Sequence, residues 1–248
     1  MKIIVNADDL GISREVNEAI FDLIAKGHIK SATLIANGPA VSDAARRVGE
    51  WPECSFGAHL NLSEFRPLSP EAAHLLTTAA GEMSRRNIEQ ARPTPGMLRA
   101  VYEEFGLQIQ KLLDLGVPLS HIDSHHHCHT IPQVFPALKA VQKRFGIRRV
   151  RASRNIYRKD EAVGRALLMK KKLFNFALRT MYGSRVPDGF TDLPTLLQMD
   201  GESARGFESI ELMTHPGAGG AEEDTAILRS QWIDALPFAA NLCSYTQL

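Results

Sequence analysis

The sequence contains few features that would require a covalent scaffold or a membrane. It has three cysteines, Cys54, Cys128 and Cys243, and no CxxC pair. This odd number excludes a ladder of disulfides and indicates a reducing compartment. No apolar run approaches the roughly 20 residues of a transmembrane helix, and the N-terminal apolar run is shorter than the core of a secretory signal. We therefore expect a soluble, cytoplasmic protein without a membrane span.

A large excess of charge of one sign is also lacking. Lys and Arg number 29 and Asp and Glu 28, for a formal net charge of +1. Because nucleic-acid-binding domains are usually strongly basic, we expect no nucleic-acid partner. The composition, 44% hydrophobic and 23% charged, excludes the disordered, collagen-like and coiled-coil classes. A chain of this length can form a core without a disulfide or a structural metal.

Short apolar runs alternate with segments of helical periodicity along the chain. Strands are predicted at 3–5, 32–36, 55–62, 121–123, 148–152, 190–193 and 209–214. Helices are predicted at 13–26, 40–48, 96–115, 132–145 and 225–236. Repeated β–α units of this kind form a mostly parallel sheet covered by helices. We therefore expect an α/β fold, either a distorted (β/α) barrel or a doubly wound sheet, in a single domain over 1–248.

Residues 63–95 differ from the rest of the chain. Four prolines bracket this segment, at positions 67, 70, 93 and 95, and it shows little periodicity. Long insertions in compact domains often form lids or binding loops. We expect this segment to be a substrate loop.

Acidic residues and histidines follow four of the predicted strands. They are Asp8–Asp9, His59, the cluster 121–129 and His215. In parallel α/β folds the active site forms where the carboxyl ends of the strands meet. Aspartate and histidine placed there together indicate a metal site with an adjacent acid–base pair.

The segment HIDSHHHCH (121–129) holds five of the nine histidines of the chain. Strand alternation predicts that His121, Asp123 and His125 share one face. Neutral imidazole is a common ligand of divalent metals, and a carboxylate often orients such a histidine. The alternative is a set of structural histidines with satisfied hydrogen bonds. We interpret Cys128 as structural.

The neighbouring Asp8 and Asp9 suit a division of roles, because adjacent side chains on a strand diverge. One can bind a metal while the other serves as a general base without being a ligand; alternatively, one caps the following helix. His59 lies in an apolar strand, where an unpaired titratable group is costly, and is a metal ligand or a hydrogen-bonded core histidine. His215, before Pro216-Gly217, is a candidate general acid or caps a sheet edge.

Nearly half of the 29 basic residues lie between positions 143 and 185, opposed only by Asp160 and Glu161. Such a segment can contact an anionic substrate. A solvated helix face or a subunit interface is the favoured interpretation. Phe174, Phe176 and Met181 in this region are consistent with a homodimer.

Four blocks resemble the YdjC-like carbohydrate deacetylase family. They are NADDLG (6–11), GAHLNL (57–62), HIDSHHHCH (121–129) and ELMTHPG (211–217), in family order and over almost the whole chain. The resemblance implies a distorted, polysaccharide-deacetylase-like (β/α) barrel with one divalent metal ion. It also implies hydrolysis of the N-acetyl group of an amino sugar or an N-acetylated oligosaccharide. Leu10 stands where the family often has Phe, and the stretch after Trp232 is short for the family.

The resemblance also implies roles for individual residues. Asp9, His59 and His125 match the metal ligands, Asp8 the catalytic base and His215 the acid, whereas His126, His127 and His129 are not ligands. Supporting or substrate-binding positions are expected at Asn6, Asn61, Asp123, His127 and His129.

We therefore hypothesise metal-assisted amide hydrolysis with Mg or Zn, and with Mn or Co as alternatives, since mixed carboxylate and imidazole ligands suit all four. Two other hypotheses stay open. One is a metal-dependent phosphoesterase, which would use similar ligands and the basic segment. The other is a non-catalytic, metal-bearing sugar-binding protein.

Overall fold

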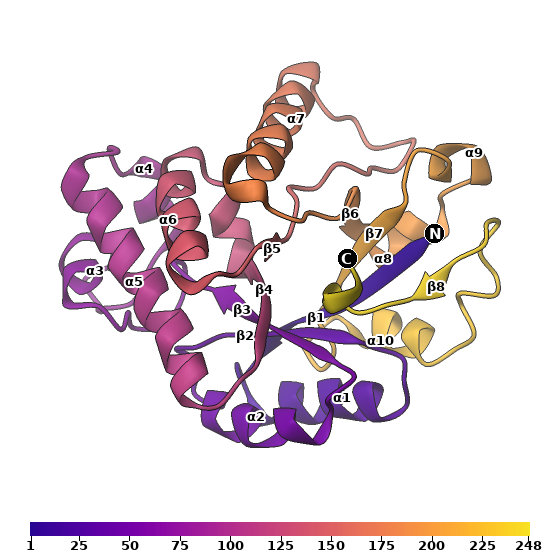
Figure 1. Ribbon diagram of the computed structural model, residues 1–248, viewed down its shortest axis with the longest axis horizontal. Helices are drawn as coiled ribbons and strands as arrows, with labels where there is room; N and C mark the ends of the chain where they lie inside the picture. Colours follow the sequence, from indigo (N-terminus) through magenta and orange to yellow (C-terminus); the bar gives the residue numbers. More distant parts are fainter.

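A curled sheet of parallel strands runs through the centre of the protein, and the helices lie around its outside (Figure 1). The computed structural model describes residues 1–248. The strands are β1 (Lys2–Leu10), β2 (Ser31–Leu34), β3 (Ser55–Leu60), β4 (Leu119–Ser124), β5 (Arg149–Val150), β6 (Gly189–Asp192), β7 (Ser209–Thr214) and β8 (Asn241–Leu242). Their order is β5-β4-β3-β2-β1-β7-β6, with β8 paired to β1. The predicted α/β class and distorted barrel are confirmed, the sheet curling into a half-barrel.

The helices follow the strands in the expected alternation. They are α1 (Arg14–Ala25), α2 (Val41–Arg47), α3 (Pro70–Leu75), α4 (Arg85–Gln90), α5 (Pro95–Asp114), α6 (Phe135–Phe145), α7 (Arg165–Thr180), α8 (Leu193–Leu197), α9 (Gly201–Ala204) and α10 (Glu222–Leu228). Ser13 caps α1 by accepting a hydrogen bond from the backbone N–H of Val16. No helix combines the length and the apolar character needed to cross a bilayer.

Strand β1 is longer than predicted. The predicted strand stops at Asn6, but β1 continues through Asp8 and Asp9 to Leu10, and eight of its nine residues are buried. A polar residue is tolerated inside a buried strand when its hydrogen bonds are satisfied. The side chains of Asn6 and Asp8 find such partners inside the half-barrel, on Thr33 and Arg151. Apolarity alone therefore gave the wrong end for this strand.

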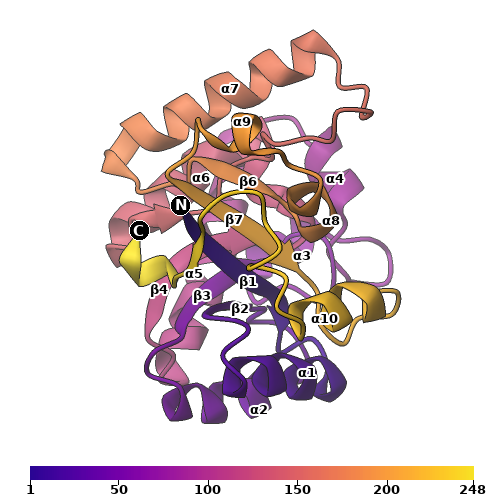
Figure 2. The same cartoon turned by 90° about the vertical axis from the view of Figure 1, so that its right-hand side faces the viewer.

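The half-barrel is completed by contacts that are not regular strand pairs. Its edge strands are β5 and β6, and Arg149 forms an isolated bridge with Arg185 near this seam. The C-terminal segment lies against β1, and the two chain ends lie near each other (Figure 2). Tyr245 from this segment is fully buried, and its ring stacks on His121 at 3.8 Å.

Two segments differ from what the sequence predicted. The predicted helix 225–236 is α10, which ends at Leu228, and turns follow it. Leu228, Trp232 and Leu236 recur every four residues and are buried. This spacing resembles one face of a helix, although Trp232 and Leu236 lie in the irregular chain after α10. Residues 63–95 contain α3 and α4 and pack onto the body, where a Glu104 carboxylate oxygen accepts hydrogen bonds from the Leu68 and Ser69 backbone N–H groups.

Candidate functional site

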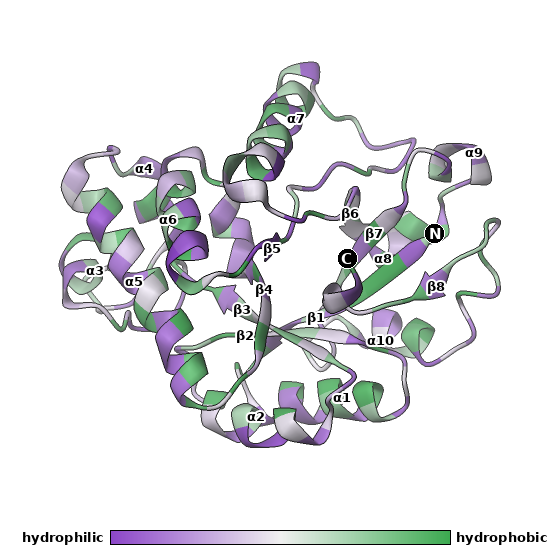
Figure 3. Ribbon diagram, viewed as in Figure 1, coloured by the Kyte–Doolittle hydropathy of each residue, from purple (hydrophilic) through white to green (hydrophobic).

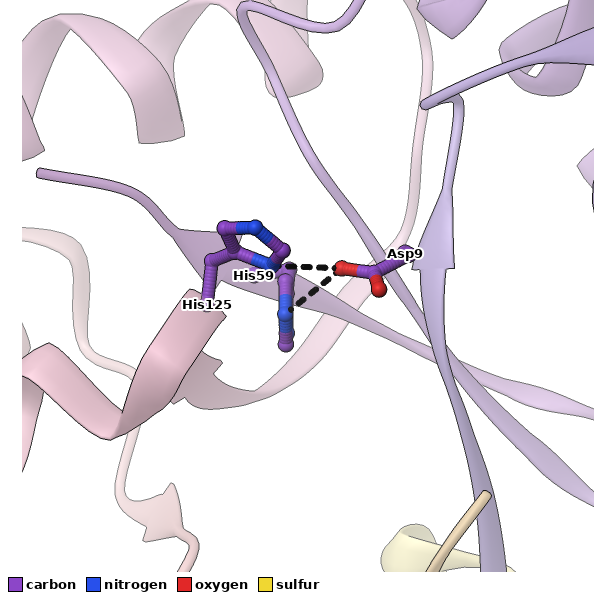
Figure 4. A group of neighbouring side chains, drawn as sticks. All are labelled: Asp9, His59 and His125. Atoms are coloured by element: carbon purple, nitrogen blue, oxygen red, sulfur yellow. Dashed lines mark ion pairs between the residues drawn. The ribbon is translucent and has the colours of Figure 1, made fainter. Parts of the chain in front are cut away.

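Asp9, His59 and His125 converge at the carboxyl end of the sheet (Figure 4). Asp9 lies near the end of β1, His59 in β3, and His125 directly after β4, where the 3₁₀ segment η2 (His125–Thr130) begins. The Asp9 Oδ1 atom lies 3.1 Å from His59 Nε2 and 2.7 Å from His125 Nδ1. Asp9 has a φ of 66°, a left-handed conformation that non-glycine residues rarely adopt and that often occurs at functional sites.

The donor atoms fit a divalent cation. His59 Nδ1 lies 2.8 Å from an Asp123 carboxylate oxygen, so this ring nitrogen donates and Nε2 is free to act as a ligand, as in carboxylate–histidine–metal sites. Apart from the close contacts of Asp9 Oδ1 with these two imidazoles, neither Asp9 Oδ1 nor His125 Nε2, both buried, has a hydrogen-bond partner. Unpaired buried polar atoms are rare and call for an explanation such as an ion. The residues therefore fit a metal held by Asp9, His59 and His125.

The surrounding charge also favours a cation. Four carboxylates are buried close together, those of Asp8, Asp9, Asp123 and Glu211. One buried guanidinium, Arg151, contacts three of them. It reaches Asp8 at 2.7 and 2.6 Å, Asp123 at 2.9 Å and Glu211 at 2.8 Å. Because the acids outnumber the buried guanidinium, a divalent ion would relieve their mutual repulsion.

The pKa directions agree with this crowding. Burial raises the pKa of the Asp8 carboxyl, but Arg151 outweighs burial and holds the pKa well below its usual range. The imidazoles of His125 and His59 do the same for the pKa of Asp9. Burial disfavours a charged His59, but the Asp123 carboxylate overcomes this and raises the pKa of His59 to about 10. Both aspartates are therefore ionised, and the surroundings of His59 attract positive charge.

Asp8 retains one open acceptor position. Its Oδ1 atom accepts from Asn6 at 2.8 Å and from Arg151 at 2.6 Å, whereas Oδ2 accepts only from Arg151. A carboxylate oxygen has two lone pairs, so Oδ2 can accept one further hydrogen bond. His215 follows β7, is partly exposed, and places Nε2 3.9 Å from this oxygen. The two residues face one another beside the cluster of Asp9, His59 and His125.

The expected supporting residues lie around this cluster. Asn6 also accepts hydrogen bonds from Ser31 and from His121 Nε2. Asn61 shapes the turn after β3, because its Oδ1 accepts from the backbone N–H groups of Ser63 and Glu64.

The remaining histidines of the cluster separate by environment. His129 Nδ1 is paired with the Ser124 hydroxyl. Burial lowers the pKa of His127 to about 3 and holds that of His129 well below its ordinary value. His126 and His127 both have left-handed backbone conformations, with φ of 47° and 53°. The ring of His126 faces outward, and its Nδ1 atom pairs with Ser63 Oγ. Neither His127 nor His129 belongs to the Asp9 cluster.

Several residues at the site were not anticipated from the sequence. Arg151 was counted in the basic segment expected on a surface, but it is fully buried; that interpretation is wrong for this residue because it neutralises the buried acids. Glu211 could have been found, since a lone acid inside the apolar run SIELMT needs a buried partner. Glu64, whose Oε2 lies 3.4 Å from His125 Nε2, and Tyr245, whose hydroxyl donates to Glu211, carry no such signal.

Comparison with known proteins agrees with the four sequence blocks. The YdjC-like protein family model matches residues 2–237. A carbohydrate deacetylase from Vibrio campbellii is 35% identical over 147 residues, which are 59% of this chain and 57% of that protein. A chitooligosaccharide deacetylase from Enterobacter is 33% identical over 220 residues, 86% of this chain and 81% of that protein.

The crystal structure of an Enterococcus faecalis protein, provisionally assigned to cellobiose-phosphate cleavage, has the same fold. Its TM-score is 0.78 at 23% identity, and the match covers 99% of this chain and 98% of that one. The family match over nearly the whole chain, together with the identity to the Enterobacter protein, shows that the chain belongs to the YdjC-like protein family.

Proposed function

We propose that this protein is a metal-dependent carbohydrate deacetylase that removes the N-acetyl group from an amino sugar or an N-acetylated oligosaccharide. The observation that carries the proposal is Asp8. It is an ionised carboxylate with one open acceptor position, beside three residues that fit a metal and opposite His215. A purely metal-binding module does not need such an unliganded carboxylate. The names of the relatives, carbohydrate deacetylase and chitooligosaccharide deacetylase, support the same activity.

The reaction adds water to the acetyl carbonyl and breaks the C–N bond, giving acetate and a free amine. A divalent ion held by Asp9, His59 and His125 would polarise the carbonyl and lower the pKa of water. Asp8 Oδ2 accepts the proton that the attacking water loses. His215 supplies a proton to the departing nitrogen, so that the amine leaves in a neutral or protonated form. Arg151 holds Asp8 in place through two hydrogen bonds.

The ligand set of one carboxylate and two imidazoles suits Mg, Zn, Mn and Co, and we propose Mg or Zn. Its two nitrogens favour Zn, whereas oxygen ligands favour Mg. Asp123 accepts from the His59 N–H and so sets which nitrogen of that ring faces the metal.

A substrate longer than one sugar has a place to bind. A cavity of about 490 Å³ is lined by His127, by Arg85 and Glu89 of the segment 63–95, and by Lys170 and Phe174 of α7. None of the proposed metal ligands or catalytic residues lines this cavity, but His127, which does, lies two residues after His125 in the chain. We propose that the segment 63–95 contributes to substrate selection, since it forms one wall.

Acetate release from a panel of N-acetylated monosaccharides and chitooligosaccharides tests the proposal. The protein is stripped of metal and reloaded with Mg, Zn, Mn or Co, beside Asp8→Asn and the exposed control Asp160→Asn. We expect metal-dependent release that Asp8→Asn reduces by about 10²–10⁴-fold and that Asp160→Asn leaves unchanged. If the folded, metal-loaded protein releases no acetate from any substrate, or instead releases phosphate from phosphorylated sugars, deacetylation is contradicted.

We also propose a reducing, cytoplasmic location. Cys54, Cys128 and Cys243 are all free and buried, which is typical of proteins that are not exposed to disulfide-forming conditions. Burial raises the pKa of the Cys128 thiol to about 12, and Cys128 belongs to none of the groups that could hold a metal.

A further inference from the structure

Helix α7 is held to the body along one narrow side. Of its 16 residues only Asn175 and Leu178 are buried. Asn175 bonds to Ser153, and the Leu178 carbonyl accepts a hydrogen bond from buried Lys139. The helix projects beyond the other elements at the edge of the molecule (Figures 1 and 2). Its opposite side therefore faces away from the protein.

An apolar ridge lies on this outward side. We define the ridge as Met169, Leu173 and Phe176, which are spaced i, i+4, i+7 and so fall on one face of a helix. Their exposed fractions, 57%, 60% and 66%, are the three highest among the large apolar residues of the chain. Figure 3 shows hydrophobic and hydrophilic residues mixed along α7. Contiguous exposed apolar residues mark an interaction surface.

Positive charge flanks the ridge, and no acid accompanies it. The helix contains Arg165, Lys170, Lys171, Lys172 and Arg179 and no Asp or Glu. At about 3.6 residues per turn, Arg165 and Lys172 lie on one side of the ridge and Lys170 on the other. An apolar face with Lys and Arg at its edges is the pattern of helices that lie in the plane of a membrane interface.

We propose that the outward face of α7 docks on an anionic lipid surface, with the ridge entering the boundary of the acyl chains and the flanking cations contacting the headgroups. The charge argues against a second copy as the occupant, since two such helices would bring ten cations together without an acid. The shape argues against an acidic protein. The ridge projects from the molecule, so a protein partner would have to supply a groove, whereas a bilayer admits a projecting helix directly.

The inner side of α7 lines a cavity that also includes His127, two residues after His125. Leu167 and Phe174 on this side, with Lys170 at its margin, line the cavity of about 490 Å³ together with His127. Docking would therefore hold this cavity one helix diameter, roughly 10 Å, from the lipid surface. Docking itself does not depend on the proposed deacetylation, and its test below does not use activity.

Vesicle flotation of the full chain tests this proposal. The vesicles are phosphatidylcholine alone or phosphatidylcholine with phosphatidylglycerol, at low and at physiological salt. We expect binding to the anionic vesicles only, weakened by salt because the headgroup contacts are screened. The variant M169Q/L173Q/F176Q should bind about tenfold or more weakly, since it loses the inserted apolar area. R165E/K172E should also lose binding, because it replaces the attraction between these cations and the anionic headgroups with repulsion.

The matched control is L75Q/L107Q/L113Q, which removes three exposed leucines from α3 and α5 and should bind like the parent protein. Thermal unfolding of each variant establishes that it is folded. Absence of binding by the parent protein, or equal loss in the control, would overturn the proposal. So would a dimer in sedimentation that M169Q/L173Q/F176Q converts to a monomer without any vesicle binding, because a second copy would then occupy the ridge.

Discussion

Replacing Arg151 with methionine tests the role of the buried charge network. The guanidinium is fully buried and contacts the carboxylates of Asp8, Asp123 and Glu211 at 2.6 to 2.9 Å. Methionine fills much of the same volume but leaves these acids without their cation. Breaking a buried ion pair from one side costs about 3–5 kcal/mol. We expect a loss of this size in the free energy of unfolding at pH 8.

The loss should shrink as the pH falls. Without Arg151 the folded-state pKa of Asp8 rises above its unfolded value near 4, because burial is then no longer outweighed by the guanidinium. Groups shifted in this direction contribute stability below the unfolded pKa and lose it as the pH rises through the folded pKa. One pKa unit corresponds to about 1.4 kcal/mol. A rise of about two units costs about 2.7 kcal/mol in all, half of it already at pH 5, so the deficit at pH 5 is smaller than that at pH 8 by roughly 1.4 kcal/mol.

Urea unfolding at pH 5 and pH 8, with chelator present, measures both values. The control is Arg149→Met, two residues away on β5 and bonded to the Thr246 carbonyl near the surface; surface substitutions of this kind change the stability by about 0.5 kcal/mol or less. A deficit for Arg151→Met that is equal at the two pH values would refute the electrostatic reasoning. A deficit as small as that of the control would show that the acids find another partner.

Three further predictions concern neighbouring residues. Asp123→Asn should weaken metal binding about 10–100-fold in calorimetric titration, because His59 loses the carboxylate that sets its tautomer, and an unchanged affinity would contradict this role. Burial raises the pKa of Glu211 to about 7, so the parent protein should lose about 2.5 kcal/mol of stability between pH 5 and pH 8. Glu211→Gln should abolish most of this pH dependence in urea unfolding. Lys139→Met removes the donor that the Leu178 carbonyl and Ser184 share. Amide exchange in 165–180 should therefore become faster, while exchange in the core is unchanged. Exchange in 165–180 at the rate of the parent protein would show that α7 is anchored without Lys139.

The sequence carried enough to predict the layout of the sheet. Alternating apolar runs and helical periods located β2, β3, β4 and β7 within a few residues, because burial on both faces of a parallel strand leaves a continuous apolar signal. The end of β1 could not be predicted in this way. Its polar residues are buried against partners from other strands, and apolarity along one segment cannot report such pairing.

The candidate site, like the sheet, was predicted in part from the sequence. The four blocks identified the family and named Asp8, Asp9, His59 and His125, since the carboxyl ends of neighbouring strands must meet. His125 is a partial exception. Strand alternation was expected to orient it, but β4 ends at Ser124, and the left-handed residues that follow belong to η2.

What the sequence by itself determined is therefore the fold class, the family and the residue types at the end of the sheet, because these follow from local periodicity and from short blocks. Only the tertiary structure decided that Arg151, alone among the cations of the basic segment, is fully buried in the core. It also placed the Tyr245 hydroxyl where it donates a hydrogen bond to Glu211. It also decided that α7 turns its apolar ridge outward. The physical reason is that burial and charge pairing depend on residues far apart in the chain. A pattern along one segment does not indicate which distant residues come into contact.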